Sequence, residues 1–93
     1  MPIRSFKCAD TQSLFGGKRV KRFMHIESVA MRKLAILNRV GSLDDLRVPP
    51  GNRLEALKGD RVGQHSIRVN DQFRVCFVWT TEGPQDLEIV DYH

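Results

Sequence analysis

The hydrophobic pattern of this chain changes period once, from that of a helix to that of strands. Between Ile26 and Val40 the apolar residues are spaced three and four apart, which predicts one amphipathic helix that Gly41 ends. From Gln64 onwards apolar and polar residues alternate, which predicts strands. This order favours an α+β fold, in which helices pack on one face of a small antiparallel sheet.

Three strands are expected in the C-terminal part of the chain. They cover Gln64–Val69, Phe73–Thr80 and Leu87–Tyr92, and turns at Asn70-Asp71 and Glu82-Gly83-Pro84 separate them. Asn, Asp and Gly tolerate the backbone angles of tight turns, so an antiparallel meander is predicted.

Shorter elements are expected before these strands. Ile3–Phe6 is predicted to form an N-terminal strand, and Asp10 to cap a helix that runs to about Phe15 and ends at Gly16-Gly17. The segment Ser42–Gly51 contains two adjacent prolines, so an extended, turn-rich connection is expected there, with neither a helix nor a central strand.

Length and composition set the remaining limits. The 93 residues, of which 41% are hydrophobic, suit a single domain over residues 1–93. No uncharged stretch is longer than Val75–Thr81, which is too short for a membrane span, and the start lacks the apolar region of a secretory signal. Two cysteines and three scattered histidines give no metal-binding pattern. A cytoplasmic protein without membrane association, metal or cofactor is therefore expected.

The charge is unevenly distributed along the chain. Residues 1–34 carry eight basic and two acidic side chains, whereas residues 75–93 carry four acidic and no basic ones. Lys18, Arg19, Lys21 and Arg22 form the densest basic run. A basic N-terminal part suits a polyanionic partner, because neutralised phosphates release their counterions.

Two arginines flank the predicted Asn70-Asp71 turn. An antiparallel hairpin with this turn places Arg68 and Arg74 on the same face of the sheet, where two guanidinium groups suit phosphate oxygens. Lys58 and Arg61 precede the hairpin and could extend that surface. Equally, the arginines could cover a solvated face, and the segment around Lys58 could be no more than a turn.

Asp91, Tyr92 and His93 close the chain and offer groups for proton transfer. Alternation places Asp91 and His93 on one face of the last strand and Tyr92 on the other. The three side chains can therefore share one site only at the end of the sheet.

Several of these blocks, in this order, resemble the HigB-type toxins of the RelE/ParE superfamily. The blocks are Leu57-Lys58-Gly59-Asp60-Arg61, Gly63, Ser66-Ile67-Arg68-Val69-Asn70, Gln72-Phe73-Arg74-Val75 and Asp91-Tyr92-His93. The resemblance implies a RelE-like α+β fold of the microbial-ribonuclease type. It also implies a toxin that cleaves mRNA in the ribosomal A site and inhibits translation, with a HigA-like helix-turn-helix antitoxin as its partner.

The resemblance further implies roles for individual residues. Arg74 would stabilise the charged transition state after attack by the 2′-hydroxyl, without a metal ion, and Asp91, Tyr92 and His93 would orient and transfer protons. Lys58, Arg61 and Arg68 would bind mRNA phosphates. The basic run Lys18, Arg19, Lys21 and Arg22 would contact ribosomal RNA.

The sequence departs from this pattern at one position. Some members of the superfamily carry a histidine three residues before the lysine, where this chain has Glu55. Either Glu55 is the general base, or His93 and Tyr92 take a larger part in proton transfer. Two other functions remain open: a ParE-like inhibitor of DNA gyrase, and a non-catalytic RNA- or protein-binding module.

Overall fold

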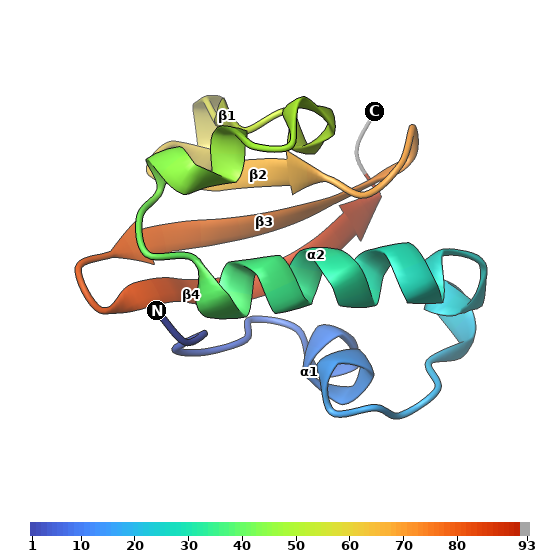
Figure 1. The fold of residues 1–93 in the computed structure, drawn as a ribbon. Helices are drawn as coiled ribbons and strands as arrows, with labels where there is room; N and C mark the ends of the chain where they lie inside the picture. Colours follow the sequence, from blue (N-terminus) through green and yellow to red (C-terminus); the bar gives the residue numbers. More distant parts are fainter. Residues whose placement is uncertain (92–93) are drawn as a thin grey trace.

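In a computed structural model, which describes residues 1–91, two helices pack on a four-stranded antiparallel sheet (Figure 1). The α+β prediction is confirmed. The helices are α1 (Ala9–Phe15) and α2 (Glu27–Arg39), and the strands are β1 (Glu55–Ala56), β2 (His65–Arg68), β3 (Phe73–Thr80) and β4 (Gly83–Asp91). Short 3₁₀ helices lie between them: η1 (Lys21–Ile26), η2 (Asp44–Arg47), η3 (Pro50–Asn52) and η4 (Gly59–Arg61).

The strands follow one another across the sheet in the order β1-β2-β3-β4. Ile67 pairs with Val75, and Val75 pairs with Ile89, so these three side chains lie in one row on the same face. All three are fully buried. This face therefore carries the hydrophobic core, on which the helices pack.

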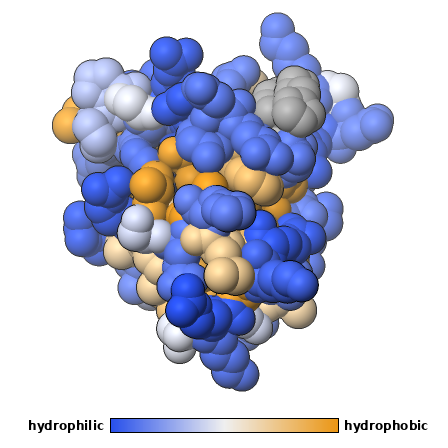
Figure 2. Space-filling model, turned by 90° about the vertical axis from the view of Figure 1, so that its right-hand side faces the viewer, coloured by the Kyte–Doolittle hydropathy of each residue, from blue (hydrophilic) through white to orange (hydrophobic). Residues whose placement is uncertain are grey.

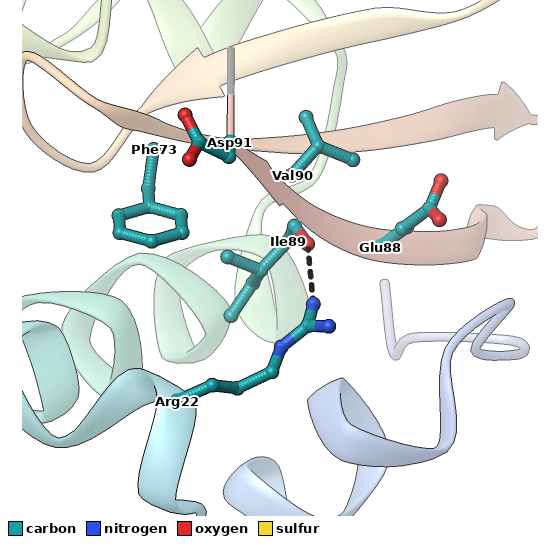
Figure 3. A pocket seen from close by; sticks show the side chains of 6 residues that line it. All are labelled: Arg22, Phe73, Glu88, Ile89, Val90 and Asp91. Atoms are coloured by element: carbon teal, nitrogen blue, oxygen red, sulfur yellow. Dashed lines mark hydrogen bonds between the residues drawn. The ribbon is translucent and has the colours of Figure 1, made fainter.

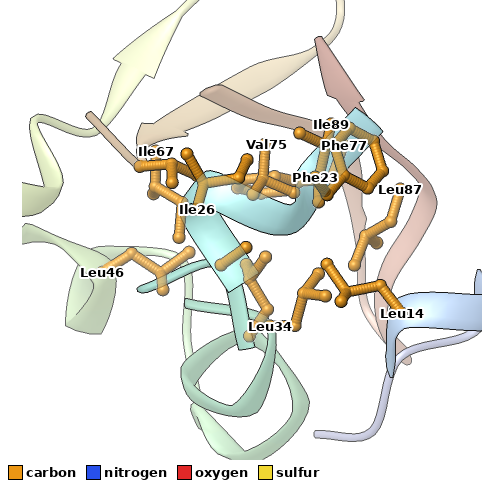
Figure 4. Close-up of a cluster of buried hydrophobic side chains, with 13 residues drawn as sticks. Leu14, Phe23, Ile26, Leu34, Leu46, Ile67, Val75, Phe77, Leu87 and Ile89 are labelled. Carbon is orange, nitrogen blue, oxygen red and sulfur yellow. The ribbon is translucent and has the colours of Figure 1, made fainter. Parts of the chain in front are cut away.

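Helix α2 has the apolar stripe that its spacing predicts. Ala30, Leu34 and Leu37 are fully buried along one side of it. Figure 4 shows Leu34 facing buried side chains of the sheet, with Leu14 of α1 at one side of the cluster. Burial of apolar area on this one face holds the helices on the sheet.

The predicted N-terminal strand does not form. Phe6 makes a single parallel bridge with Leu87, and the amide of Arg4 donates to the carbonyl of Pro84. Asp86 of β4 has a positive φ of 55°, which interrupts the regular edge along which a strand could continue. The N-terminal segment therefore follows β4 without a continuous ladder.

The predicted cap of α1 is also wrong. Cys8 occupies the N-cap position and makes no side-chain capping bond, while Asp10 lies inside the first turn. Its carboxylate lies 3.5 Å from Nε of Arg22. Asp10 therefore links α1 to η1, and its negative charge in the first turn suits the helix dipole.

The prediction that residues 42–51 contain no helix is wrong as well. Helices η2 and η3 lie there, although each has only three or four residues. Pro50 occupies a first-turn position of η3, where its missing N–H costs no hydrogen bond. A single 3₁₀ turn needs only one or two bonds between residues three apart, so prolines do not prevent it.

The edges of the sheet differ from the expectation. The two-residue strand β1 was not predicted, and it pairs with β2 through Glu55 and Ala56. Strand β4 begins at Gly83, earlier than expected, and a register shift between Cys76 and Val78 bends its pairing with β3. The expected end of the last strand, Tyr92, lies outside the described residues. Within residues 1–91, no helix is both long and apolar enough to span a bilayer.

Candidate active site

The polar face of the sheet, opposite the core, carries the candidate site. Glu55, Ser66, Cys76 and Glu88 are successive partners across the four strands, so they form one row on this face. Arg68, Arg74 and Val90 form the next row. The alternation of side chains along each strand therefore places several predicted site residues on one surface.

Arg74 occupies the centre of this face and is only 8% exposed. Its Nε donates to Oγ of Ser66 at 2.7 Å, and its Nη2 donates to the carbonyl oxygen of Arg53 at 2.7 Å. A buried cation requires such partners, because it has lost its hydration. The guanidinium group is therefore held in one orientation in the absence of any ligand.

Glu55 lies next to Arg74 at the edge of the sheet. Its Oε2 is 3.3 Å from Nη2 of Arg74, and its side chain is 53% exposed. The pairing of Glu55 with Ser66 across β1 and β2 brings the carboxylate over the guanidinium. Two predicted catalytic residues thus form an ion pair in which the cation is fixed and the anion is accessible to solvent.

Arg68 lies directly opposite Arg74, as the hairpin geometry predicts. Like charges at opposed positions repel, so each guanidinium needs its own acceptors. Nη2 of Arg68 donates to the carboxylate of Asp71 in the adjoining turn. The two arginines share a face, but the structure directs their guanidinium groups to different partners.

Arg61 and Lys58 lie at opposite ends of the short segment around η4. Nη1 of Arg61 donates to Gln64 at 3.1 Å and to Oε1 of Glu88 at 3.3 Å. Lys58 is exposed and precedes η4. Arg61 is thereby tied to β4 on the polar face, whereas Lys58 stays accessible to an incoming anion.

Cys76 lies between these charged groups on β3. Burial raises the pKa of its thiol above the ordinary value of 9.0, and the Glu88 carboxylate acts in the same direction. The Arg61 and Arg74 guanidinium groups lower it without reversing the shift. A buried, protonated thiol is a poor nucleophile, so Cys76 acts here as a packing residue.

Asp91 ends the described part of β4 on the other side of the sheet. It pairs with Phe73, whose side chain packs against the core, and Nε2 of Gln72 donates to its Oδ2 at 3.0 Å. By register, Asp91 therefore lies on the face opposite Arg74. The predicted residues Tyr92 and His93 lie outside the described residues.

A pocket of about 400 Å³ surrounds this end of β4. Figure 3 shows Arg22 reaching Ile89 from η1, with Phe73 and Asp91 to the left, near the end of β4. Figure 2, which views this side of the molecule, shows apolar atoms in the middle of a hydrophilic surface. Glu88 and Val90 complete the lining, so the pocket extends around the edge of the sheet towards its polar face.

The arginines and the lysines of the basic run before α2 differ in their contacts. Arg19 lies 3.7 Å from Glu27, and Arg22 both pairs with Asp10 and donates to the carbonyl of Ile89 at 3.4 Å. Lys18 and Lys21 are exposed. The two arginines therefore contact neighbouring parts of the chain, whereas the two lysines are suited to contact a polyanion.

Two residues of the site are not predicted from the sequence. The alternation of β2 indicates only a strand face for Ser66, and no pattern indicates Arg53. The hairpin register locates Ser66, since it places Ser66 opposite Cys76 and therefore beside Arg74. No local signal could locate Arg53, because its contribution is a backbone carbonyl.

A metal site would need several ligating side chains close together. Within residues 1–91, no three His, Cys, Asp or Glu side chains are grouped so that they could hold a metal ion. The polar face instead combines a fixed guanidinium, an accessible carboxylate and further cations. These groups can bind a phosphate and accept a proton near it.

Comparison with known proteins places this arrangement in a family. A family model described as the RelE-like toxin of the type II toxin–antitoxin system HigB matches residues 9–93. Toxin HigB-1 of Vibrio cholerae is 52% identical over 54 residues, which cover 58% of this chain and 57% of that protein. An uncharacterized protein of Haemophilus influenzae is 35% identical over 63 residues, covering 68% of this chain and 62% of that protein.

The chain thus spans less than two thirds of the length of either relative, whereas the family model matches nearly all of it. The matched region includes both helices, all four strands and every residue of the polar face described above. The chain belongs to the HigB family, the RelE-like toxins of type II toxin–antitoxin systems.

Proposed function

We propose that this chain is an endoribonuclease toxin that cuts mRNA in the A site of the ribosome and so inhibits translation. Family membership supports the toxin assignment, and the Arg74–Glu55 pair supports the chemistry. The single observation that carries the proposal is a guanidinium fixed by Ser66 and Arg53 beside an accessible carboxylate. Its cognate antitoxin, a HigA-like protein with a helix-turn-helix domain, would neutralise it.

The proposed reaction needs no metal ion. The 2′-hydroxyl of the nucleotide before the cut attacks the adjacent phosphorus, and its proton passes to a general base. The bond from phosphorus to the 5′-oxygen breaks, and that oxygen takes a proton from a general acid. The products are a 2′,3′-cyclic phosphate and a free 5′-hydroxyl.

Arg74 and Glu55 would divide two tasks in this reaction. The guanidinium group would stabilise the extra negative charge on the pentavalent phosphorus, and its fixed orientation avoids reorganisation during the reaction. Glu55 would accept the proton of the 2′-hydroxyl. By resemblance, Tyr92 and His93 would serve the leaving group, and the two would take a larger part in proton transfer if Glu55 is not the base. Asp91, which by register lies on the face opposite Arg74, would orient these groups from the end of β4.

The remaining cations would bind the RNA on either side of the cut. Lys58, Arg61 and Arg68 would contact mRNA phosphates on the polar face, and Lys18, Arg19, Lys21 and Arg22 would contact ribosomal RNA. Phosphate contacts of this kind position a nucleic acid without reading its sequence.

The proposal is tested by inducing the chain in growing bacteria and mapping cuts by primer extension. Wild type should arrest growth and produce discrete cuts within translated mRNAs. Arg74→Ala should reduce cleavage by about a hundredfold or more, because it removes charge stabilisation of the transition state. Arg74→Lys should restore little, because an ammonium group lacks the planar fork with which the guanidinium reaches Ser66 and Arg53.

Arg39→Ala is a matched control, because it removes one exposed cation from the far end of α2. It should leave the arrest unchanged. Circular dichroism of each variant separates loss of activity from loss of fold. Undiminished arrest by a folded Arg74→Ala variant would refute the proposed role, and DNA breaks without mRNA cuts would indicate gyrase inhibition instead.

A further inference from the structure

A buried asparagine lies directly before the residue whose carbonyl binds Arg74. Asn52 ends η3 and is fully buried. Its Nδ2 donates to the carbonyls of Leu46 and Val48 at 3.1 and 3.3 Å, and its backbone amide donates to Pro49 at 2.9 Å. Its side chain therefore holds together the loop between α2 and β1.

The oxygen of the same amide is bound from α2. Nζ of Lys33 donates to Oδ1 of Asn52 at 2.5 Å. Burial lowers the pKa of Lys33, and the nearby charges of Arg32 and Arg68 act in the same direction. The chain thus keeps an ammonium group in an unfavourable environment, where it satisfies a buried oxygen.

Arg53 follows Asn52 in a backbone conformation that side chains disfavour. Its φ and ψ are 46° and 56°, in the left-handed region. Its amide donates to Pro50 at 3.1 Å, and its carbonyl accepts the 2.7 Å bond from Nη2 of Arg74. A non-glycine residue keeps such a conformation only where its surroundings determine it.

These contacts form one continuous path from α2 to β3. Lys33 fixes the amide of Asn52, the amide fixes the loop, and the loop directs the carbonyl of Arg53 at the guanidinium. Glu55 follows two residues later on β1, so the same loop also sets the position of the carboxylate.

We propose that Asn52 is a positioning residue, which holds the backbone of Arg53 so that its carbonyl orients the Arg74 guanidinium. The effect on guanidinium orientation is a property of the free protein. Only the consequence for RNA cleavage rests on the proposed function. Asn52 touches neither substrate nor reacting atoms and acts entirely through Arg53 and Arg74.

The first test reads the guanidinium directly in the full chain without RNA. The Nε–H group of Arg74 donates to Ser66, so its nitrogen-15 resonance should be sharp and protected from exchange in wild type. In Asn52→Ala, exchange of this proton should rise by about tenfold or more, because the Arg53 carbonyl is no longer fixed. Lys33→Met should show a smaller rise.

A control must lose stability without touching the loop. Leu14→Ala removes buried apolar atoms of α1, which packs on α2 and β4. It should leave exchange of the Arg74 Nε–H within about twofold of wild type under native conditions. If Asn52→Ala unfolds, the Lys33→Met variant carries the test, since it removes one bond and keeps the asparagine.

The second test measures cleavage on translating ribosomes. Asn52→Ala should lower kcat by about tenfold and change KM by less than about threefold, because binding cations are untouched. Arg74 exchange equal to wild type in both Asn52→Ala and Lys33→Met would overturn the positioning role. A wild-type chain that cuts no RNA would refute the proposed function, and the exchange data would still decide the role of Asn52.

Discussion

Arg74 shows how a single charged residue is accommodated in a small sheet. A guanidinium that is 8% exposed has lost most of its hydration, and Ser66, Arg53 and Glu55 provide acceptors in its place. The first two of these acceptors are neutral, so they orient the guanidinium without cancelling its charge. Orientation by neutral acceptors suits a cation that has to stabilise a negatively charged phosphate.

Cys76 gives a prediction at the same scale. Burial raises the pKa of its thiol above 9.0 in the folded chain, while the unfolded chain releases this proton near 9.0. The folded state therefore binds more protons above about pH 9, and the unfolding free energy falls as the pH rises through this range. Cys76→Ala cannot show this decrease.

Urea denaturation of wild type and Cys76→Ala at about pH 8 and about pH 10 tests this expected decrease in unfolding free energy. The stability advantage of wild type over Cys76→Ala should be smaller at the higher pH. Titration of Lys33 is common to both proteins and cancels in the difference. An advantage that stays constant or grows would show that the thiol titrates alike in both states.

At the scale of elements, the outer edge of β4 is covered by parts of the chain that precede it. Ser5 and Lys7 exchange backbone bonds with Leu87, the hydroxyl of Thr11 accepts from the amide of Ile89, and Arg22 donates to the Ile89 carbonyl. An exposed strand edge can pair with a strand of another chain. These contacts occupy the outer edge of β4 and therefore disfavour such pairing.

Substitutions at Thr11 test how much these contacts at the edge of β4 contribute to the unfolding free energy. Thr11→Val has nearly the same shape but leaves the buried amide of Ile89 without an acceptor, which should cost about 1–3 kcal/mol of unfolding free energy. Thr11→Ser keeps the hydroxyl and should cost about 1 kcal/mol for the missing methyl group. Urea denaturation gives both values.

Amide hydrogen exchange at Ile89 distinguishes loss of the hydrogen bond from loss of the methyl group. Protection of this amide should fall in Thr11→Val and persist in Thr11→Ser. A valine variant more stable than the serine variant, with Ile89 still protected, would show that the hydroxyl contributes nothing.

At the scale of the whole molecule, the charge distribution separates cations that contact carboxylates from cations available to a ligand. Arg19, Arg22 and Arg61 all contact carboxylates, although Arg19 and Arg22 are themselves exposed. Lys18 and Lys21 are exposed around the start of η1. Ion pairs at the surface add little stability, but they reduce the charge presented to a polyanion. The net charge of +4 alone therefore does not locate the binding surface.

The double variant Lys18→Ala/Lys21→Ala should bind ribosomes more weakly at low salt, and the difference from wild type should shrink as the salt concentration rises. For each lysine that neutralises a phosphate in wild type, its removal should reduce the slope of log affinity against log salt by about 0.7 to 0.9. Arg39→Ala/Arg47→Ala removes the same net charge elsewhere and is the matched control. Equal weakening in both variants would mean that only net charge matters, against a binding surface at the basic run.

Much of the fold could be predicted because it depends on local patterns. The stripe of α2 and the strand β3 are set by residues a few positions apart, and the structure confirms both elements. Burial along β3 does not alternate, because Arg74 and Cys76 on the polar face are buried as well. The turn at Asn70 also fixes the register that places Arg68 opposite Arg74. The predictions that are wrong concern segments with weak periodicity: the N-terminal strand, the Asp10 cap and the helix-free connection over residues 42–51.

The candidate site could be predicted only in part. The resemblance to the HigB-type toxins indicated Arg74 and Glu55 as catalytic candidates, and the structure places their charged groups 3.3 Å apart. Asp91 was expected to share their site, yet its register puts it on the opposite face of the sheet. Strand alternation already predicts this separation, whereas the pocket at the end of β4, which residues from both faces line, became visible only in three dimensions.

By itself, the sequence determined which residues are buried along α2, which side of β3 faces the core and which cations face one another across the β2–β3 hairpin, because these depend on periodicity and turn geometry. Only the tertiary structure decided how Arg74 is held. Its partners include a backbone carbonyl at Arg53, 21 residues earlier, which a buried amide and a lysine from α2 keep in place. Residue types do not indicate where a backbone carbonyl will lie, so only the folded structure shows its position.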